Sequence, residues 1–554
     1  MNGHELKMQL LHTICIAAFA LVALGRADGI EISTRLGDVL GTTLQTRLGE
    51  DFYAFRGIRY ALPPFRNLRF QNPKPYPAWK PNTYDATQDG PMCPQVTENV
   101  TDLSEDCLRL NVYTKDTKKR KPVVVYIHPG GFYGVSGQSK NFAGPEHLMD
   151  RDIVLVTINY RLGTLGFLAT GSAEAPGNAG LKDQVEALRW VRNNIRCFGG
   201  NPRAVTLLGY SAGSFSIGLH MLSPMSRGLF HRAIMMSASP LGQFDYEHQQ
   251  KRLSDRQADL LDCPRKPADQ LVNCLKQKPM MDFVNTTAEM FDFNWNPVLN
   301  WMPVIEDDFG QERFLVEDPY ETIQTGTFHK VPLIIGITEH EFVGGAYNLL
   351  KNETTRTWLN ENFEKYAPIA LMYERDTPRS VEISKTLRRY LPNGPLALPH
   401  SLQTFGKLYS DAIIGFEYHR FLDLISRFTS VYTYLFTYKG RYSHFDIDGE
   451  VYGAVHHDEL LYLFHVPVMT PLFSATDPED EVIENLTRMW TEFARKGDPN
   501  NDADAYLKDL HWPPYNGNTK PYLNIGAKLA VSSGGIFPER FQNWDKLFPV
   551  PQFT

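Results

Sequence analysis

Residues 204–222 read AVTLLGYSAGSFSIGLHML, and this stretch decides the fold. The apolar, β-branched run at 204–208 is typical of a buried strand, and the spacing of apolar residues from Ala212 onward is typical of a helix. The five residues between them, 209–213, therefore predict a tight strand-to-helix corner. Ser211 lies at the tip of that corner, where its hydroxyl would face solvent.

Small residues on either side of Ser211 are what such a corner requires. A serine on so tight a turn has a strained backbone, and Gly209 and Gly213 leave room for the flanking chain to pass close to it. The N–H of Ala212, at the start of the helix, would point to where an anion forms during acyl transfer. G-x-S-x-G also arises by chance, so this interpretation depends on catalytic partners elsewhere in the chain.

Further strand and helix patterns alternate along the chain. Because strands that alternate with helices pair in parallel through right-handed crossovers, we expect an α/β fold with a mostly parallel, doubly wound central sheet. The segments at 253–316 and 346–430 predict helical cap insertions over the site. The expected strands are at 122–127, 153–159, 204–208, 233–237, 331–336 and 431–438, and a further helix is expected at 180–198.

Composition narrows the classes of function. A 554-residue chain with 42% hydrophobic residues can bury a large core, and no linker or repeat divides it, so we expect one domain at 28–554. A net charge of −7 argues against a nucleic-acid partner, and the basic run at 115–121 is interpreted as a solvated loop.

Residues 1–27 predict a secretory signal peptide. An apolar run at 10–24 is followed by small residues around Arg26, the pattern that a signal peptidase reads. A membrane anchor is the weaker interpretation, because the run is short and no second one follows, and the C-terminus lacks the tail of a lipid-anchor signal. Passage through a secretory lumen would also allow glycosylation at four sequons, Asn99, Asn285, Asn352 and Asn485.

Five cysteines remain once Cys15 leaves with the signal peptide. In an oxidising compartment two short loops are the natural disulfides, which leaves Cys197 as a buried free thiol. We expect no metal site, because no C-x-x-C or zinc-type spacing is present. The expected disulfides are Cys93 with Cys107 and Cys263 with Cys274.

A glycine-rich loop, His128-Pro129-Gly130-Gly131, follows the strand at 122–127 directly. It could be a plain tight turn, or a loop whose backbone N–H groups face a ligand. Beside a corner serine the second interpretation is favoured. Phosphate binding is disfavoured, because no P-loop or dinucleotide-binding glycine pattern follows a strand.

A nucleophilic serine needs a histidine base and a carboxylate that orients it. In chain order the acid should follow a late strand, and the base should come later still. Glu339 and Glu341 compete for the acid after the strand at 331–336, and His456 and His457 compete for the base after the strand at 431–438, taken as the final one. A metal cluster at residues 456–459 is the minor alternative, because zincin spacing is absent.

Together these residues resemble the type-B carboxylesterase and cholinesterase family of α/β-hydrolases, most closely its secreted invertebrate (insect-type) carboxylesterases. Nearly the whole mature chain matches, and the resemblance implies Ser211 as nucleophile, Glu341 as acid and His456 as base. It also implies an oxyanion hole at Gly130, Gly131 and Ala212, and both cysteine pairs match the disulfides of the family. The matching stretches include FRGIRYALPP, SEDCLRLNVY, NYRLGTLGFL, GNAGLKDQVEALRWVRNNIRCFGGNP and MWTEFARKGDP.

Four positions depart from the pattern of the family. Tyr210 stands where glutamate is usual, Pro129 where the first oxyanion-loop glycine is usual, Ser214 where a glycine is usual, and His457 where a small residue is usual. None of them removes a member of the triad. The loop at 93–107 is shorter than in cholinesterases, so choline recognition is not expected.

We therefore expect a secreted serine hydrolase that cleaves carboxylic esters through an acyl-enzyme, without a cofactor. Its partner would be a small-molecule ester, with no nucleic acid and no stable membrane insertion. A non-catalytic binding or adhesion protein on the same fold is the alternative, and a lipase is a second one. The acyl group, the alcohol group and the oligomeric state stay open.

Overall fold

Strand β10 (Gly200–Tyr210) lies at the centre of the main sheet in this computed structural model, which describes residues 29–553. It pairs in parallel with β6 (Lys121–Ile127) on one side and with β11 (Arg232–Met236) on the other. The strand expected at 204–208 is therefore the carboxyl half of a longer one. The predicted signal peptide at 1–27 lies outside the described residues.

Within residues 29–553 this sheet has 13 strands, in the order β1-β2-β3-β5-β7-β6-β10-β11-β12-β13-β16-β17, with β4 paired to β2. From β7 to β16 neighbouring strands are parallel, while the flanking pairs are antiparallel. The fold is thus mixed but mostly parallel at its centre, where the site lies. The other strands are β1 (Ile30–Ser33), β2 (Asp38–Gln45), β3 (Asp51–Arg59), β4 (Thr83–Asp85), β5 (Arg109–Thr114), β7 (Val154–Ile158), β12 (Leu333–Thr338), β13 (Val431–Phe436), β16 (Tyr522–Ile525) and β17 (Leu529–Ser532).

Alternating side chains of the central strands build two separate cores. Val125 and Leu207 belong to one core, and their chain neighbours Tyr126 and Leu208 belong to the other. Successive residues of a strand point to opposite faces, so a strand that is apolar throughout must be covered on both. Helices α3 (Ala179–Asn194), α4 (Ala212–Leu222) and α14 (Phe416–Ile425) cover the first face, and α16 (Asp480–Lys496) covers the second.

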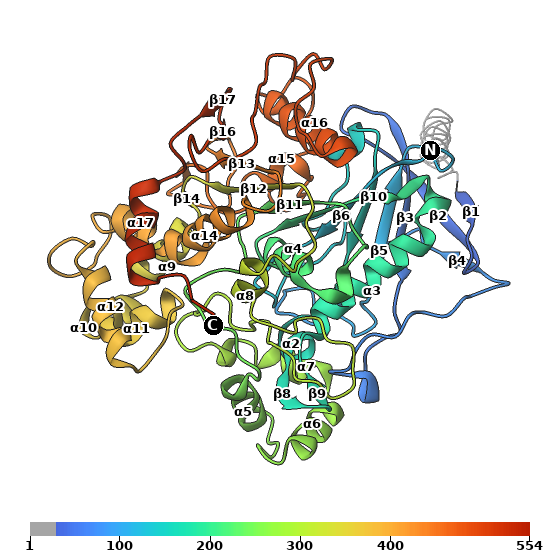
Figure 1. The fold of residues 1–554 in the computed structure, drawn as a ribbon. Helices are drawn as coiled ribbons and strands as arrows, with labels where there is room; N and C mark the ends of the chain where they lie inside the picture. Colours follow the sequence, from blue (N-terminus) through green and yellow to red (C-terminus); the bar gives the residue numbers. More distant parts are fainter. Residues whose placement is uncertain (1–28, 554) are drawn as a thin grey trace, which may run out of the picture.

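The cap expected at 253–316 and 346–430 consists of two groups of helices, but the second segment extends too far, because α14 within it packs on the central sheet. In Figure 1 one group lies below the sheet and the other at the left, beside α9 and α17. The lower group is α5 (Lys251–Leu260), α6 (Ala268–Gln277) and α7 (Met280–Asn285). The left group is α10 (Glu353–Glu361), α11 (Phe363–Ala370) and α12 (Pro378–Arg388). The remaining helices are α2 (Gly163–Phe167), α8 (Pro319–Gln324), α9 (Val343–Lys351), α13 (Leu402–Ser410), α15 (Leu460–Leu463) and α17 (Pro538–Leu547), and two small hairpins are β8 (Ala169–Ser172) with β9 (Ala175–Pro176) and β14 (Asp446–Ile447) with β15 (Glu450–Val451).

Three expectations about the elements need correction. The helix expected at 180–198 ends at Asn194 and continues as the 3₁₀ turn η4 (Ile195–Phe198). The strand at 431–438 is not the final one, because β16 and β17 follow it, and the antiparallel strands on the β1 side were not anticipated. Several of these edge strands are short or only half-buried, so they lack the continuous apolar run that identified the central strands.

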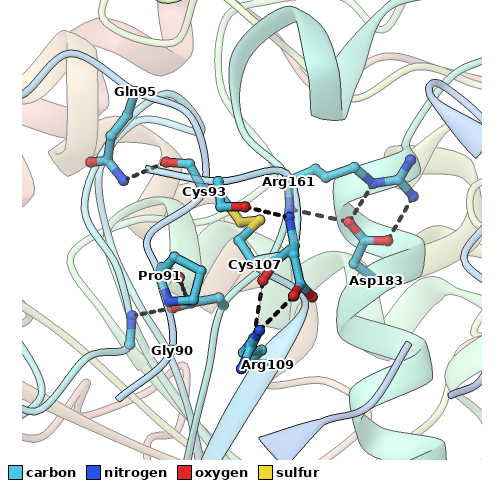
Figure 2. The surroundings of a disulfide bond; sticks show 12 residues. Gly90, Pro91, Cys93, Gln95, Cys107, Arg109, Arg161 and Asp183 are labelled. Carbon is cyan, nitrogen blue, oxygen red and sulfur yellow. Dashed lines mark hydrogen bonds and ion pairs between the residues drawn. A yellow bond between two sulfur atoms is a disulfide. The ribbon is translucent and has the colours of Figure 1, made fainter. Parts of the chain in front are cut away.

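Both expected disulfides are present. The Cα atoms of Cys93 and Cys107 lie 5.0 Å apart, and those of Cys263 and Cys274 lie 5.8 Å apart. The first disulfide lies close to the buried ion pair of Arg161 Nη2 with Asp183 Oδ1, at 2.6 Å (Figure 2). Cys197 is a free thiol as expected, but it is half-buried rather than buried, because the helical turn that carries it lies near the surface.

The four sequons differ in exposure. Asn485 lies in the middle of α16 and is 8% exposed, a position that disfavours glycosylation. Asn99, Asn285 and Asn352 lie at exposed positions. Among the helices of residues 29–553, none combines the length and the apolar character that a membrane crossing needs.

Candidate active site

Ser211 lies at the corner between β10 and α4, in a conformation that glycine neighbours make possible. Its φ of 52° and ψ of −121° are strained for an L-residue. A methyl group on Gly213 would lie 2.0 Å from the carbonyl oxygen of Ile127, and one on Gly209 would lie 2.5 Å from the backbone of Gly213. Both glycines of GYSAG are therefore required by direct contact, as the sequence predicted.

Backbone hydrogen bonds hold this corner against the next strand. The Ser211 N–H donates to the Met236 carbonyl at 2.8 Å, and the Ser211 carbonyl accepts from the Phe215 N–H at 2.8 Å. The side chain itself makes no hydrogen bond to any residue of 29–553. The hydroxyl of Ser211 is thus left free while its backbone is fixed on both sides.

Ser211 and the glycine-rich loop after β6 line one common cavity. Gly130 and Gly131 have φ values of 109° and 57°, and a methyl group on Gly130 would lie 2.1 Å from the Gly134 carbonyl oxygen. The Gly130 carbonyl accepts from the N–H groups of Tyr133 and Gly134, both at 2.9 Å. Within residues 29–553 the N–H groups of Gly130 and Gly131 donate to no other residue. These two donors are available to a ligand.

Two contacts hold the start and the end of this loop. His128 stacks on Tyr160, with ring centroids 4.3 Å apart, and its Nδ1–H donates to the Pro129 carbonyl at 2.8 Å. Burial lowers the pKa of His128 to about 4, so it stays neutral. Beyond the glycines, the side-chain amide of Gln95, labelled in Figure 2, donates to the Val135 carbonyl at 2.9 Å, which ties the loop to the first disulfide.

Glu341 and His456 form a buried pair. His456 Nδ1 lies 2.5 Å from Glu341 Oε2, and the two residues are 8% and 3% exposed. The other oxygen, Oε1, accepts from the Thr338 N–H and the Ser237 hydroxyl, both at 2.7 Å. Glu341 therefore has an acceptor role on both oxygens, and this geometry distinguishes it from Glu339, whose side chain is 43% exposed.

Strand-like pairing brings these two residues together over 115 positions of the chain. His340 pairs in parallel with Val455, just after β12. The His456 N–H then donates to the Glu341 carbonyl at 2.9 Å. The backbone thus sets the register in which Glu341 faces His456 and not His457.

A cavity of about 400 Å³ joins all of these groups. Ser211, Gly130, Gly131 and His456 line it together. The second ring nitrogen of His456, Nε2, is buried and makes no hydrogen bond to any residue of 29–553. Of the six residues predicted for the catalytic centre, only Ala212 is not part of the cavity wall, and its N–H begins α4 directly after Ser211.

Tyr210 connects the nucleophile corner to the histidine loop. Its hydroxyl accepts from the His457 N–H at 2.7 Å and lies 3.0 Å from Ser237 Oγ and 3.1 Å from Glu459 Oε2. Burial, and then the nearby Glu341, raise the pKa of Glu459 well above its usual range. A neutral Glu459 can form a hydrogen bond with the Tyr210 hydroxyl without adding a second buried charge beside Glu341.

Ser237 and Glu459 are supporting residues that the sequence pattern did not reveal. The structure separates the residues of the alternative metal cluster at 456–459. His456 faces Glu341, Glu459 faces Tyr210, and Asp458 accepts from the Ser443 hydroxyl at 2.8 Å. An acidic residue in so apolar a surrounding as ELLYLF was the available signal that Glu459 is buried and paired.

The strand order, the corner serine and the glycine loop define an α/β-hydrolase. Residues 28–544 match the model of the carboxylesterase family, and the chain belongs to that family. It is therefore a carboxylic ester hydrolase by family.

Relatives of known name match over most of their length. The chain is 34% identical to juvenile hormone esterase of Tribolium castaneum, over 89% of this chain and 88% of that protein. It is 31% identical to venom carboxylesterase-6 of Apis mellifera, over 89% and 90%. Among solved structures, juvenile hormone esterase from Manduca sexta, with OTFP covalently attached, superposes with a TM-score of 0.82 at 26% identity, covering 94% of this chain and all of that one.

Proposed function

We propose that the protein is a secreted serine esterase in which Ser211, His456 and Glu341 act as the catalytic triad. The hydrogen-bonded Glu341–His456 pair beside the strained Ser211 corner, in one cavity, is the observation that carries this proposal. A buried pair of this kind holds the imidazole in one tautomer and leaves its other nitrogen free to take a proton.

The chemistry follows from these positions. His456 Nε2 takes the proton of the Ser211 hydroxyl as its Oγ attacks the ester carbonyl carbon. The N–H groups of Gly130, Gly131 and Ala212 stabilise the resulting oxyanion. The C–O bond to the alcohol then breaks, and the imidazolium returns the proton to the leaving oxygen.

Water completes the cycle through the same groups. His456 takes a proton from a water molecule as it attacks the acyl-enzyme, and the acid leaves as the proton returns to Ser211 Oγ. Glu341 stays ionised throughout and stabilises the imidazolium. The proposed mechanism requires no cofactor and no metal.

Extracellular location is part of the proposal. Two disulfides and three exposed sequons fit a chain that passes through a secretory lumen after a signal peptide at residues 1–27, with residues 28–554 as one domain. Relatives named as a juvenile hormone esterase and a venom carboxylesterase fit a small ester as substrate, which a cavity of about 400 Å³ can hold.

Organophosphate labelling with mass mapping tests the proposal. The wild-type protein should hydrolyse short-chain esters and be labelled on Ser211, and Ser211→Ala should lose both properties, with a fall in kcat of about 10⁶. Ser214→Ala is the matched control. Ser214 is the third residue of α4, and its hydroxyl is occupied in a hydrogen bond to the Ala238 carbonyl at 2.6 Å, whereas the hydroxyl of Ser211 is free within residues 29–553. Labelling that persists in Ser211→Ala, or a folded wild-type protein without turnover, would contradict the proposal and favour a binding protein.

A further inference from the structure

The active-site cavity has polar side chains that the proposed mechanism does not use. Its wall consists largely of glycine and apolar residues, among them Val135, Val298, Phe342 and Phe445. The polar side chains outside the proposed mechanism are Tyr133, Asn348, His444 and His457, and of these the two histidines continue from His456. In ligand sites that are mostly apolar, a few placed polar groups usually set orientation and specificity.

His456, His457 and His444 form a row of three imidazoles. The ring centroids of His456 and His457 are 4.3 Å apart, and those of His457 and His444 are 5.0 Å apart. Because His456 is the group that would protonate the leaving oxygen, the row begins where the alcohol part of an ester begins. His457 and His444 continue it along the cavity wall.

Both additional imidazoles are held in place through their backbones. The His457 N–H donates to the Tyr210 hydroxyl at 2.7 Å, and the His444 N–H donates to Asp458 Oδ1 at 2.9 Å. His457 has a φ of 83°, which glycine would adopt without strain. His457 thus carries an imidazole in a backbone conformation that favours glycine over residues with a side chain.

Neither imidazole has a hydrogen-bonding partner among residues 29–553, and the Nε2 atom of each is buried. Burial, and then the neighbouring His456, lower the pKa of His444 to about 4 and that of His457 well below its usual range. Each ring is therefore neutral, with one donor and one acceptor to offer. Buried polar groups without partners are costly, and a ligand that pairs with them gains selectivity.

We propose that His444 and His457 form a polar subsite for the leaving alcohol, and that the preferred substrates are esters whose alcohol carries a hydroxyl group close to the ester oxygen. This inference rests on the proposed function and names its substrate class. A hydroxyl suits two neutral imidazoles, because it can donate to one and accept from the other.

Matched pairs of esters test the subsite on the purified full chain. The first pair is 2-hydroxyethyl butanoate and propyl butanoate, which differ by a hydroxyl in place of a methyl group on the alcohol. The second pair, propyl 3-hydroxybutanoate and propyl 3-methylbutanoate, places the same exchange on the acyl side. We expect kcat/KM to favour the hydroxyl by about tenfold in the first pair and to be nearly equal in the second.

Three variants assign the preference to its residues. His457→Gly relieves the backbone strain and should bring the ratio for the first pair close to one, and His444→Phe should lower it while keeping the ring stacked on Phe142. His457→Asn keeps a hydrogen-bonding group that tolerates positive φ, and should retain part of the preference. Val298→Ala, an apolar change in the same cavity wall, is the control. It should change kcat/KM by the same factor for both esters of the first pair.

Organophosphate labelling of Ser211 in each variant separates the outcomes. A wild-type enzyme that is labelled and cleaves both alcohol esters equally would overturn the subsite and leave the esterase standing. So would a preference that survives in both His457→Gly and His444→Phe, or one confined to the acyl pair. A protein that is neither labelled nor active would overturn the esterase and the subsite together.

Discussion

The backbone around Ser211 is positioned by contacts that exclude a single methyl group, whereas the side chains around His456 are positioned by hydrogen bonds. At the nucleophile corner, a methyl group on Gly213 would lie 2.0 Å from a neighbouring carbonyl oxygen. At the base, three donors converge on the carboxylate of Glu341. Activity should therefore be lost at the Ser211 corner when atoms are added to the backbone, and at the His456 pair when a hydrogen-bond donor or acceptor is changed.

After the loss of the nucleophile itself, the largest effect should come from the carboxylate of Glu341. In Glu341→Gln the amide oxygen would take the place of Oε1, where Thr338 and Ser237 donate, so the NH₂ group would face His456 Nδ1. His456 would then carry its proton on Nε2, the wrong tautomer for a base. We expect kcat to fall by about 10⁴ with an intact fold, measured by ester hydrolysis and circular dichroism.

Glu339→Gln is the control for that experiment. Its side chain is 43% exposed and should matter little. If Glu339→Gln had the larger effect, the assignment of the acid would be wrong.

In the oxyanion loop, the addition of one methyl group should lower kcat by less than Glu341→Gln does, and it should act only through a steric clash. Gly130→Ala would place Cβ 2.1 Å from the Gly134 carbonyl oxygen at a φ of 109°, so the loop must shift and its N–H groups lose their alignment. We expect kcat to fall by about 10²–10³. Gly134→Ala, with no atom closer than 3.8 Å to its Cβ, should stay within a few-fold of wild type. Equal effects of the two changes would refute a steric cause.

Tyr210 connects the two regions by hydrogen bonds, and its substitution should have a smaller effect on kcat than the changes above. Tyr210→Phe removes the acceptor of the His457 N–H and the contact with Glu459, which leaves buried polar groups unpaired. We expect a loss of about 1–3 kcal/mol in the free energy of unfolding and about a tenfold fall in kcat, with KM little changed. Tyr434→Phe removes only a 3.4 Å contact with Glu459 and should do less. An unchanged kcat in Tyr210→Phe would show that the two regions are independent.

The smallest effect on turnover concerns His220, which supports α4 behind the corner and should affect stability alone. His220 of α4 is buried between Gln184, at 2.9 Å, and Ser226, at 2.7 Å, and burial lowers its pKa to about 3. The unfolded chain binds a proton below pH 6.5 and the folded one does not, so this stabilisation is full above pH 6.5 and is lost as pH falls toward 3.

Urea unfolding at pH 6 and pH 4 measures that loss. Between about pH 6 and pH 4, the free energy of unfolding of the wild-type protein should fall more steeply than that of His220→Gln, by up to about 1.4 kcal/mol per pH unit. Identical pH slopes would show that His220 does not remain neutral in the folded state.

Local pattern predicted the nucleophile corner well, for a physical reason. A strand, a serine between two glycines and a helix lie within 19 consecutive residues, and the steric requirement acts between near neighbours. The central strands were predicted for a similar reason, because strands covered on both faces are apolar throughout. The edge strands share their polarity with loops, and β16 and β17 were missed on that account.

By itself, the sequence pattern determined the fold class, the corner at Ser211, the glycine loop and two candidates each for the acid and the base, and the resemblance to a family implied Glu341 and His456 among them. Only the tertiary structure decided that Glu341 faces His456, since their register depends on pairing between chain segments 115 residues apart. It also decided that Asn485 is buried in α16, and that His444 and His457 line the cavity. Local sterics can be read from neighbouring residues, but burial and side-chain direction depend on which distant segments pack together.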